Sequence, residues 1–250
     1  MKKSKIIAGA LVACLAVGAG ATTAACGEGD PNIYVTNATE LVTAVEEAKG
    51  GDKIVLNANI DLEAGLQINK ELIIDLNGKT LTAENDTAGN GIFCVVSGGK
   101  LTIDGNGTVN AASQANDYSM AVWATQGGEV IINGGIFTNL GAKTFEDNGI
   151  TPNNNELIYA SKGGKITING GEFIGNYENQ THGTRYTLNQ KDENPNTVEI
   201  EAGNIIVKGG KYHGYNPAES LSENPQANFV ADGYTVTFDG LYYVVSGISE

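Results

Sequence analysis

The sequence predicts an all-β fold, a single-stranded right-handed parallel β-helix (a solenoid) with an N-terminal capping helix and a C-terminal β-hairpin cap. A glycine-centred phrase recurs along the chain with its second glycines 29, 36 and 39 residues apart, which indicates one structural unit repeated with insertions. Apolar residues alternate with polar ones beside each phrase, as in strands with one buried face. The phrase stands at 98–105, 127–134, 163–170 and, more loosely, 203–209.

Residues 1–25 predict an export signal. Lysines at the extreme N-terminus precede an uncharged Ala/Gly-rich run and then small residues up to Cys26, which is the three-part pattern of a bacterial signal peptide. Ala and Gly make a poor spanning helix, which argues against a retained membrane anchor. Two processing modes stay open, ordinary cleavage after Ala25 and lipidation of Cys26. We expect a secreted or outer-surface protein with a short linker at 26–32 and a β-helix domain at 33–250.

The net charge of the chain limits the classes of partner that it can bind. With 29 acidic and 15 basic residues the formal net charge is −14, and removal of the lysine-bearing signal would make it more negative. So acidic a surface repels nucleic acid and anionic lipid. Two cysteines, Cys26 and Cys94, would remain after export, which is too few for a disulfide framework. We therefore expect stability to come from packing.

The two ends of the repeat array carry patterns of caps. Asn37 and Glu40 have the spacing of a helix start, and Gly50 and Gly51 end the apolar helical pattern. We expect this helix to plug the N-terminal end of the array, since stacked units leave both ends open. Two β-like runs flank the turn dipeptide at 239–240, which predicts a hairpin that closes the C-terminal end.

Each unit is expected to hold three short strands, one before the glycine pair, one after it and one after an Asn-Gly-Gly turn. Because identical units stack, equivalent side chains should form columns along the axis. One interior column is expected to be an aromatic stack of Phe137, Phe173 and Tyr212. A corner column is expected to be a structural amide ladder rather than a metal site, and it holds Asp104, Asn133, Asn169 and Lys208.

The phrases at 51–56 and 74–79, together with the Gly-Gly and Asn-Gly-Gly turns, resemble the pectate-lyase-like right-handed parallel β-helix superfamily. More narrowly, they are similar to small repeat proteins on the surfaces of gut bacteria and their phages. The resemblance covers roughly residues 33–246. It implies the fold but little about activity, because this superfamily includes lyases, hydrolases, tailspikes, adhesins and passive scaffolds.

Enzymes of this superfamily carry patterns that can be looked for in the chain. The Asn-Thr-Asp, Asp-Asp, Gly-His-Gly and Arg-Ile-Lys patterns of the pectin-hydrolysing branch do not occur. The one arginine, Arg185, lies in the segment 181–186 together with His182 and Tyr186. These three side chains could remove a proton beside a uronate carboxylate and neutralise the charge that develops. A polysaccharide lyase is therefore one hypothesis, and a polar loop without activity is the alternative reading of the same residues.

The insertions suggest where a ligand would bind. Segments 110–119, 139–156 and 176–196 all fall between the third strand of one unit and the first strand of the next, so they should emerge on one side. The acidic stretch at 146–149 could bind calcium, although it lacks the full spacing of a calcium loop, and no other cofactor is indicated. The adjacent first strands, expected at 93–95, 122–124, 158–160 and 198–200, would present an outward column of Cys94, Trp123, Tyr159 and Glu199.

Exposed aromatic rings beside Asn- and Tyr-rich loops suit sugars, which offer apolar C–H faces and hydroxyl groups. We therefore predict a glycan-binding or adhesin-like module that is not catalytic. If the loops instead fold over the rings, the module is a passive scaffold with no small ligand. The residues expected to bind the polysaccharide or cell-surface glycan are Trp123, Tyr159, Tyr118, Tyr177 and Tyr186.

Overall fold

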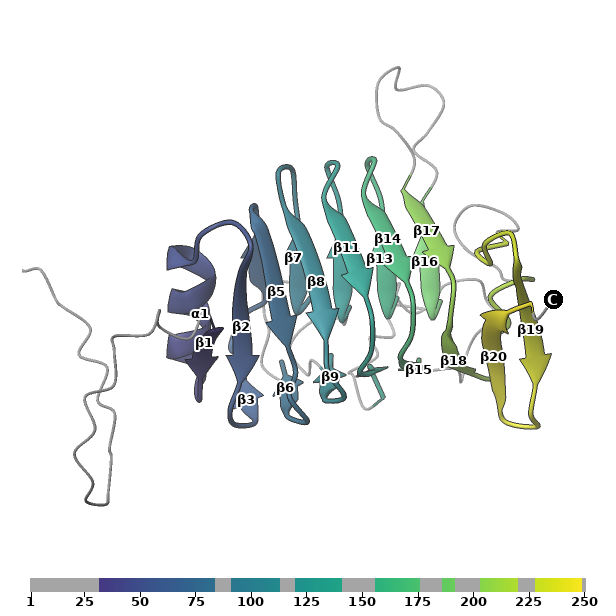
Figure 1. Ribbon diagram of the computed structural model, residues 1–250, viewed down its shortest axis with the longest axis horizontal. Helices are drawn as coiled ribbons and strands as arrows, with labels where there is room; N and C mark the ends of the chain where they lie inside the picture. Colours follow the sequence, from purple (N-terminus) through teal and green to yellow (C-terminus); the bar gives the residue numbers. More distant parts are fainter. Residues whose placement is uncertain are drawn as a thin grey trace, which may run out of the picture. The chain divides into compact units, whose positions relative to one another are not determined.

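Parallel strands dominate the protein. The computed structural model describes residues 32–83, 91–112, 120–140, 156–175, 186–191, 203–219 and 228–248. Within these ranges there are twenty strands and one helix, and the strands join into three sheets. Figure 1 shows equivalent strands following one another from the helix end to the terminal hairpin.

The three sheets have seven, five and eight strands in the described part of the chain. The seven-stranded sheet is parallel throughout and contains, in order, β1 (Asn32–Val35), β2 (Asp52–Leu56), β5 (Glu71–Asp75), β8 (Lys100–Asp104), β11 (Glu129–Ile132), β14 (Lys165–Ile168) and β17 (Asn204–Val207). The five-stranded sheet, also parallel, contains β4 (Leu66–Ile68), β7 (Phe93–Val95), β10 (Val122–Ala124), β13 (Ile158–Ala160) and β16 (Leu188–Gln190).

The eight-stranded sheet is parallel except at its C-terminal end, where the last two strands run antiparallel. Its parallel strands are β3 (Ile60–Asp61), β6 (Thr80–Thr82), β9 (Thr108–Asn110), β12 (Ile136–Thr138), β15 (Glu172–Ile174) and β18 (Gly210–His213). The antiparallel pair is β20 (Tyr242–Gly247), next to β18, followed by β19 (Tyr234–Phe238) at the edge.

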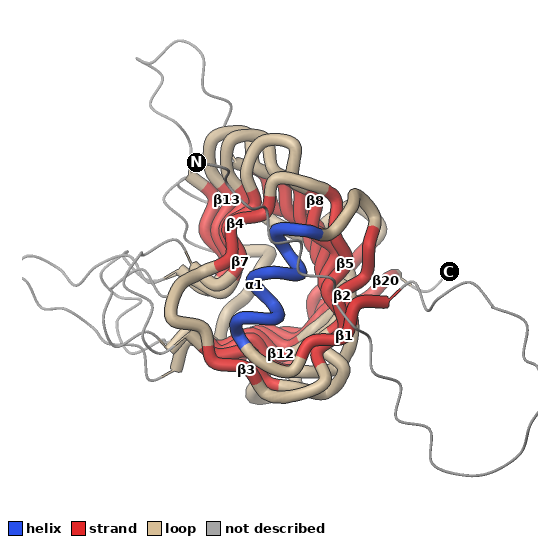
Figure 2. The backbone as a smooth tube through the Cα atoms, turned by 90° about the vertical axis from the view of Figure 1, so that its left-hand side faces the viewer, coloured by secondary structure: helices blue, strands red, loops and turns tan. Residues whose placement is uncertain are grey.

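The chain visits the three sheets in rotation. From β2 to β18, each strand lies in a different sheet from the one before it, and from β2 to β15 each pairs with the strand three elements further on. We call three consecutive strands, one in each sheet, a repeat unit. Figure 2, which looks along the row of units, shows the strands in three groups around a common interior.

Side chains that point inward form continuous buried columns. Ile103, Ile132 and Ile168 are register partners on successive strands of the seven-stranded sheet, and each is completely buried. The predicted aromatic stack is confirmed, with ring centroids 5.2 Å apart for Phe137 and Phe173 and 4.9 Å apart for Phe173 and Tyr212. Each buried ring contributes on the order of 2 kcal/mol of hydrophobic stabilisation. This interior explains why the apolar residues alternate along the sequence.

The second glycine of each glycine pair stacks closely on the preceding unit. A Cβ atom added at Gly164 would collide with the carbonyl oxygen of Ala124, and one at Gly128 would collide with that of Val95. The same contact recurs at Gly203, the single glycine that remains of the pair in the last unit. The phrase therefore recurs because the turn from the five-stranded to the seven-stranded sheet leaves no room for a side chain.

The predicted amide ladder is present at the corner after the seven-stranded sheet. Asn133 Nδ2 donates to Asp104 Oδ1 and Asn169 Nδ2 donates to Asn133 Oδ1, both at 2.8 Å. One unit earlier, Asp75 pairs in register with Asp104 and forms an ion pair with Lys53 at 2.7 Å. The ladder therefore links successive units by hydrogen bonds, as expected for a structural column.

Helix α1 (Ala38–Glu47) begins as the sequence predicts and covers one end of the units. The amide N–H of Glu40 donates to Asn37 Oδ1 at 3.0 Å, which satisfies one of the unpaired donors at a helix start. Leu41 and Val45 are buried in the common core, and Figure 2 shows α1 lying across the interior. Strand β1, which precedes the helix and adds to the seven-stranded sheet, is not anticipated in the sequence.

The C-terminal end is closed by three separate features. The predicted hairpin is confirmed as β19 and β20, and it extends the eight-stranded sheet. At the seven-stranded sheet, Val230 bridges Val207, and Phe229 is 3% exposed. At the five-stranded sheet, the Tyr215 hydroxyl donates to the carbonyl oxygen of Leu188 at 2.9 Å. A different segment therefore contacts the last parallel strand of each sheet.

One predicted strand is wrong. The sequence places the last strand of the five-stranded sheet at 198–200, which lies outside the described residues, with Glu199 in the outward column, but the strand that pairs with β13 is β16 at Leu188–Gln190. The expected position was set by the usual distance between the strand and the following glycine, here Gly203. In this unit the extra residues lie between the strand and that glycine. Consequently the expected insertion at 176–196 contains a strand, and Asn189 takes the place assigned to Glu199.

Candidate functional site

The candidate site is the outer face of the five-stranded sheet. Each of its strands has three residues, and in β10 and β13 the first and third are buried while the middle one points outward. Because the strands are parallel and in register, the middle residues form one column across the sheet. In order from β4 to β16 the column is Gln67, Cys94, Trp123, Tyr159 and Asn189.

Two aromatic rings stand next to each other in this column, as predicted. The ring centroids of Trp123 and Tyr159 are 6.0 Å apart, and the ring planes are inclined by 23°. Both side chains are half-buried, so the rings are neither fully covered nor free of the protein surface. The sequence hypothesis of an exposed platform and that of a covered core each describe part of this arrangement.

Hydroxyl groups fix the orientation of the tryptophan. The indole Nε1 of Trp123 donates to Ser161 Oγ at 3.0 Å, and Ser161 Oγ donates to Thr125 Oγ1 at 3.3 Å. Ser161 and Thr125 are both 2% exposed. A partly buried donor loses stabilisation if it gives up its partner, so this bond favours one orientation of the indole.

The neighbours of the ring pair differ in character. Toward the helix end, Cys94 is 7% exposed, and burial raises the pKa of its thiol to about 11. A thiol with this pKa stays protonated at neutral pH and is a poor nucleophile. Toward the hairpin end, Asn189 is completely buried and donates from Nδ2 to Glu156 Oε1 at 3.0 Å. The rings therefore lie between an inert thiol and a buried amide–carboxylate pair.

The remaining predicted site residues divide into one that is buried and several that lie outside the described ranges. Tyr186 is 8% exposed, so it does not belong to the surface that the ring pair presents. The predicted residues outside the described part of the chain are Cys26, Tyr118, Tyr177, His182, Arg185 and the acidic stretch at 146–149.

Other features of the described residues lie away from the ring pair. Two grooves flank α1, with volumes of about 450 and 650 Å³. No cluster of three or more His, Cys, Asp or Glu side chains suited to a metal ion occurs among the described residues. The one helix in the described ranges, α1, lacks the length and apolar character needed to cross a membrane.

Sequence reasoning did not anticipate the polar residues around the rings. Thr125 and Ser161 each stand two residues after an aromatic member of the column, and this shared hydroxyl position is the signal that could have revealed them. No sequence pattern indicated the Asn189–Glu156 pair, because the position of Asn189 depends on the register of β16 against β13.

Comparisons of the chain with family models, with curated proteins and with the solved structures find no match in any of the three. The functional argument therefore depends on the geometry of the site.

Proposed function

We propose that this protein is an exported, non-catalytic module that binds neutral glycans on the outer face of its five-stranded sheet. The binding residues in this proposal are Trp123 and Tyr159. A hexose or a short oligosaccharide would place the apolar C–H face of a sugar ring on the exposed parts of these rings.

The fold that carries this site is, in the proposal, one right-handed parallel β-helix of six or seven coils. The rotation of the chain through three sheets supports it, because each strand from β2 to β15 pairs with the strand three elements later. The stacked interior columns and the close packing of Gly128 and Gly164 on the preceding unit also fit a wound chain. Membership of the pectate-lyase-like superfamily remains part of the same proposal.

The observation that carries the function is the fixed ring pair. Outward columns of this protein vary in composition: one on the seven-stranded sheet alternates Lys and Glu, and one on the eight-stranded sheet contains Thr108, Ile136, Glu172 and Lys211. The pair of Trp123 and Tyr159 combines two large rings, partial exposure and a partly buried hydrogen bond that holds the indole. An amphipathic ring fixed in this way provides contact area at a low cost in conformational entropy.

The charge of the chain selects the class of glycan. A net charge of −14 opposes the approach of polyuronates and sulfated polysaccharides. A neutral glycan meets no such repulsion. Export through the segment 1–25, with or without lipidation of Cys26, would bring the module to a place where such glycans occur.

Retention on immobilised neutral polysaccharides tests the proposal. We expect Trp123→Ala to weaken binding at least tenfold, which corresponds to about 1.4 kcal/mol, while the fold persists. Tyr159→Ala should weaken binding in the same direction. The matched control is Tyr34→Ala, because Tyr34 is a 49% exposed aromatic residue on β1 in another sheet.

Three outcomes would contradict the proposal. Unchanged retention of the Trp123→Ala protein would remove the ring pair from the binding surface. Loss of binding by Tyr34→Ala alone would move the site to the groove beside α1, which Tyr34 lines. Release of unsaturated products that absorb ultraviolet light from a polyuronate, abolished by Arg185→Ala, would replace the proposal with a lyase.

A further inference from the structure

The strand β19 forms the outer edge of the eight-stranded sheet, and no described strand lies beyond it. The direction of its backbone groups follows from the two ends of the hairpin. The N–H of Asp239 donates to the carbonyl of Tyr242, and the N–H of Ile248 donates to that of Gly233. Because hydrogen-bonded pairs alternate along an antiparallel ladder, Thr235 and Thr237 bond toward β20, and Val236 and Phe238 direct their backbone groups outward.

This edge lacks the features that protect sheet edges from pairing. Proteins blunt edges with charged residues, prolines, bulges or very short strands. The edge strands β3, β4 and β16 have only two or three residues. In contrast, β19 has five residues, Tyr-Thr-Val-Thr-Phe, without a charge, a proline or a glycine.

Large apolar side chains stay exposed around the same edge. Phe238 is 57% exposed, and Leu241 in the hairpin turn is 54% exposed. Ile248, just after β20, is 62% exposed. Phe238 and Val236 lie on the face of the hairpin that continues the interior, because they pair in register with Tyr243 and Val245. The hairpin thus carries an apolar surface together with an open row of backbone hydrogen-bonding groups.

We propose that β19 pairs with β19 of a second copy of this chain, in an antiparallel and two-fold symmetric arrangement centred on Val236. In this register the two Val236 residues exchange two backbone hydrogen bonds. The N–H of each Phe238 reaches the carbonyl of Tyr234 in the other copy. The outcome is a continuous sheet that spans both copies, an isologous contact of the kind that closes a dimer.

The positions of the charged residues beside β19 favour pairing with a second copy of the chain. The centred register places Thr235 opposite Thr237 of the other copy and places Asp239 opposite Gly233, while Asp232 faces Gly240. No acid therefore opposes another acid, although each copy carries a net charge of −14. An uncharged, self-complementary strand is thus a point at which two such acidic chains can meet.

Two double variants test the pairing by sedimentation velocity over a wide range of protein concentration. Thr235→Lys with Thr237→Lys places lysine opposite lysine twice across the edge. Thr235→Lys with Thr237→Glu places lysine opposite glutamate twice. Both threonines are exposed and bond toward β20 through their backbone, so neither variant removes a hydrogen bond of the hairpin.

The parent protein should form a concentration-dependent dimer. The lysine–lysine variant should dimerise at least tenfold more weakly, and the lysine–glutamate variant should dimerise as well as the parent or better. High salt should reduce the difference between the two variants. A parent that remains monomeric at every concentration would overturn the proposal. Equal dimerisation of the two variants would also overturn it. So would pairing of β19 with a strand of another protein in place of a second copy of this chain.

Discussion

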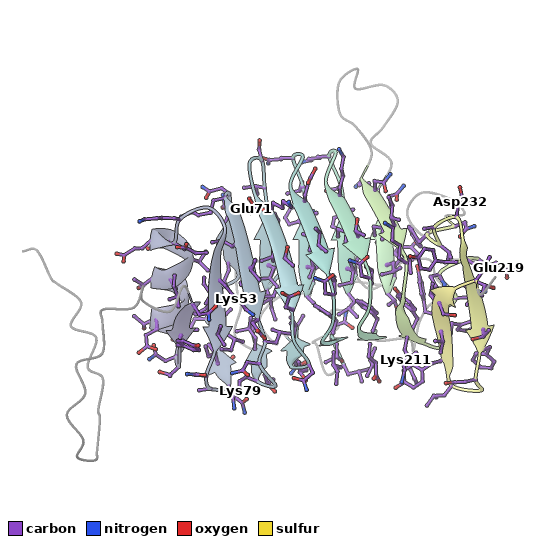
Figure 3. All side chains as sticks on the ribbon, in the orientation of Figure 1. Lys53, Glu71, Lys79, Lys211, Glu219 and Asp232 are labelled. Atoms are coloured by element: carbon purple, nitrogen blue, oxygen red, sulfur yellow. The ribbon has the colours of Figure 1, made fainter. Side chains whose placement is uncertain are left out.

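The outer faces of the seven-stranded and five-stranded sheets are built on the same repeat but differ in chemistry. On the seven-stranded sheet, charges alternate along a column from Glu71 to Lys100, Glu129 and Lys165, which are register partners, and Lys100 forms an ion pair with Glu71 at 3.2 Å. Figure 3 shows the labelled Lys53 and Glu71 on strands of this sheet. On the five-stranded sheet, the column changes from thiol to indole to phenol to amide.

This difference bears on which column is the candidate site. A column that repeats its chemistry is explained by contacts between neighbouring units, such as the amide ladder through Asn133. Change along a column is not by itself the mark of a site, because the outward column of Thr108, Ile136, Glu172 and Lys211 on the eight-stranded sheet changes as well. The ring pair of Trp123 and Tyr159 differs in that it joins two half-buried aromatic rings with a hydrogen bond from the indole to Ser161. Ligand binding is the explanation that we propose for it.

The largest effect should come from charging an interior column. Ile168 is completely buried, so Ile168→Asp would bury an unpaired carboxylate and cost about 4 kcal/mol or more. We expect loss of the cooperative unfolding transition in urea. The control, Thr167→Asp, alters the next residue of the same strand, which is half-buried on the outer face, and should leave the transition in place. A cooperative Ile168→Asp protein would show that the register is wrong.

The close packing of the glycine turns should give the next largest effect. Gly164→Ala would press a methyl group against the carbonyl of Ala124, and we expect a loss of about 3 kcal/mol in the free energy of unfolding. Gly50 has no atom near the position of an added Cβ, so Gly50→Ala should change stability by less than about 0.5 kcal/mol. Equal effects of the two substitutions in urea titrations would refute the stacking explanation.

The amide ladder should be sensitive to charge. Asn133→Asp would place a carboxylate beside Asp104 Oδ1, where Asn133 now donates. Repulsion raises the pKa of a carboxyl in such a pair, so stability should fall as pH rises through that value. We expect a loss of about 1 kcal/mol at neutral pH, recovered in part in acid, where the protonated group can donate again. A loss that does not change with pH would contradict this account.

The smallest effect at neutral pH concerns Cys94. Its pKa is raised to about 11 from the ordinary value of 9.0 by burial, so the unfolded chain releases the proton first as pH rises. Stability from this group is complete below about pH 9 and is lost between pH 9 and 11. Cys94→Ala should flatten that alkaline decline in urea midpoints. Parallel pH profiles of the two proteins would mean that the thiol is not shielded.

Repetition decided how much of the fold could be predicted. The stack of Phe137, Phe173 and Tyr212 was predictable because three units place an aromatic residue at the same position after a glycine turn. The strand at Leu188–Gln190 was not, because its unit carries extra residues between the strand and Gly203 and the glycine was the only guide to register.

The site was predictable only in outline. The column of first strands indicates that Trp123 and Tyr159 are neighbours, since both stand in the middle of equivalent strands. The hydroxyl residues that follow Trp123 and Tyr159 by two positions can be read from the sequence. The bond from the indole to Ser161 also depends on the rotamer of Trp123, which the sequence does not give. The closure by Tyr215 and Phe229 lies outside the repeat altogether.

Fluorescence of Trp123 tests the central claim most directly, because it is the one tryptophan of the chain. Acrylamide, a neutral quencher that the acidic surface does not repel, should reach the half-buried indole of the free protein. We predict that a neutral polysaccharide protects the indole from quenching and shifts its emission, and that Tyr159→Ala weakens this response. A quenching constant that no glycan changes would contradict the account and leave the ring pair as a structural column.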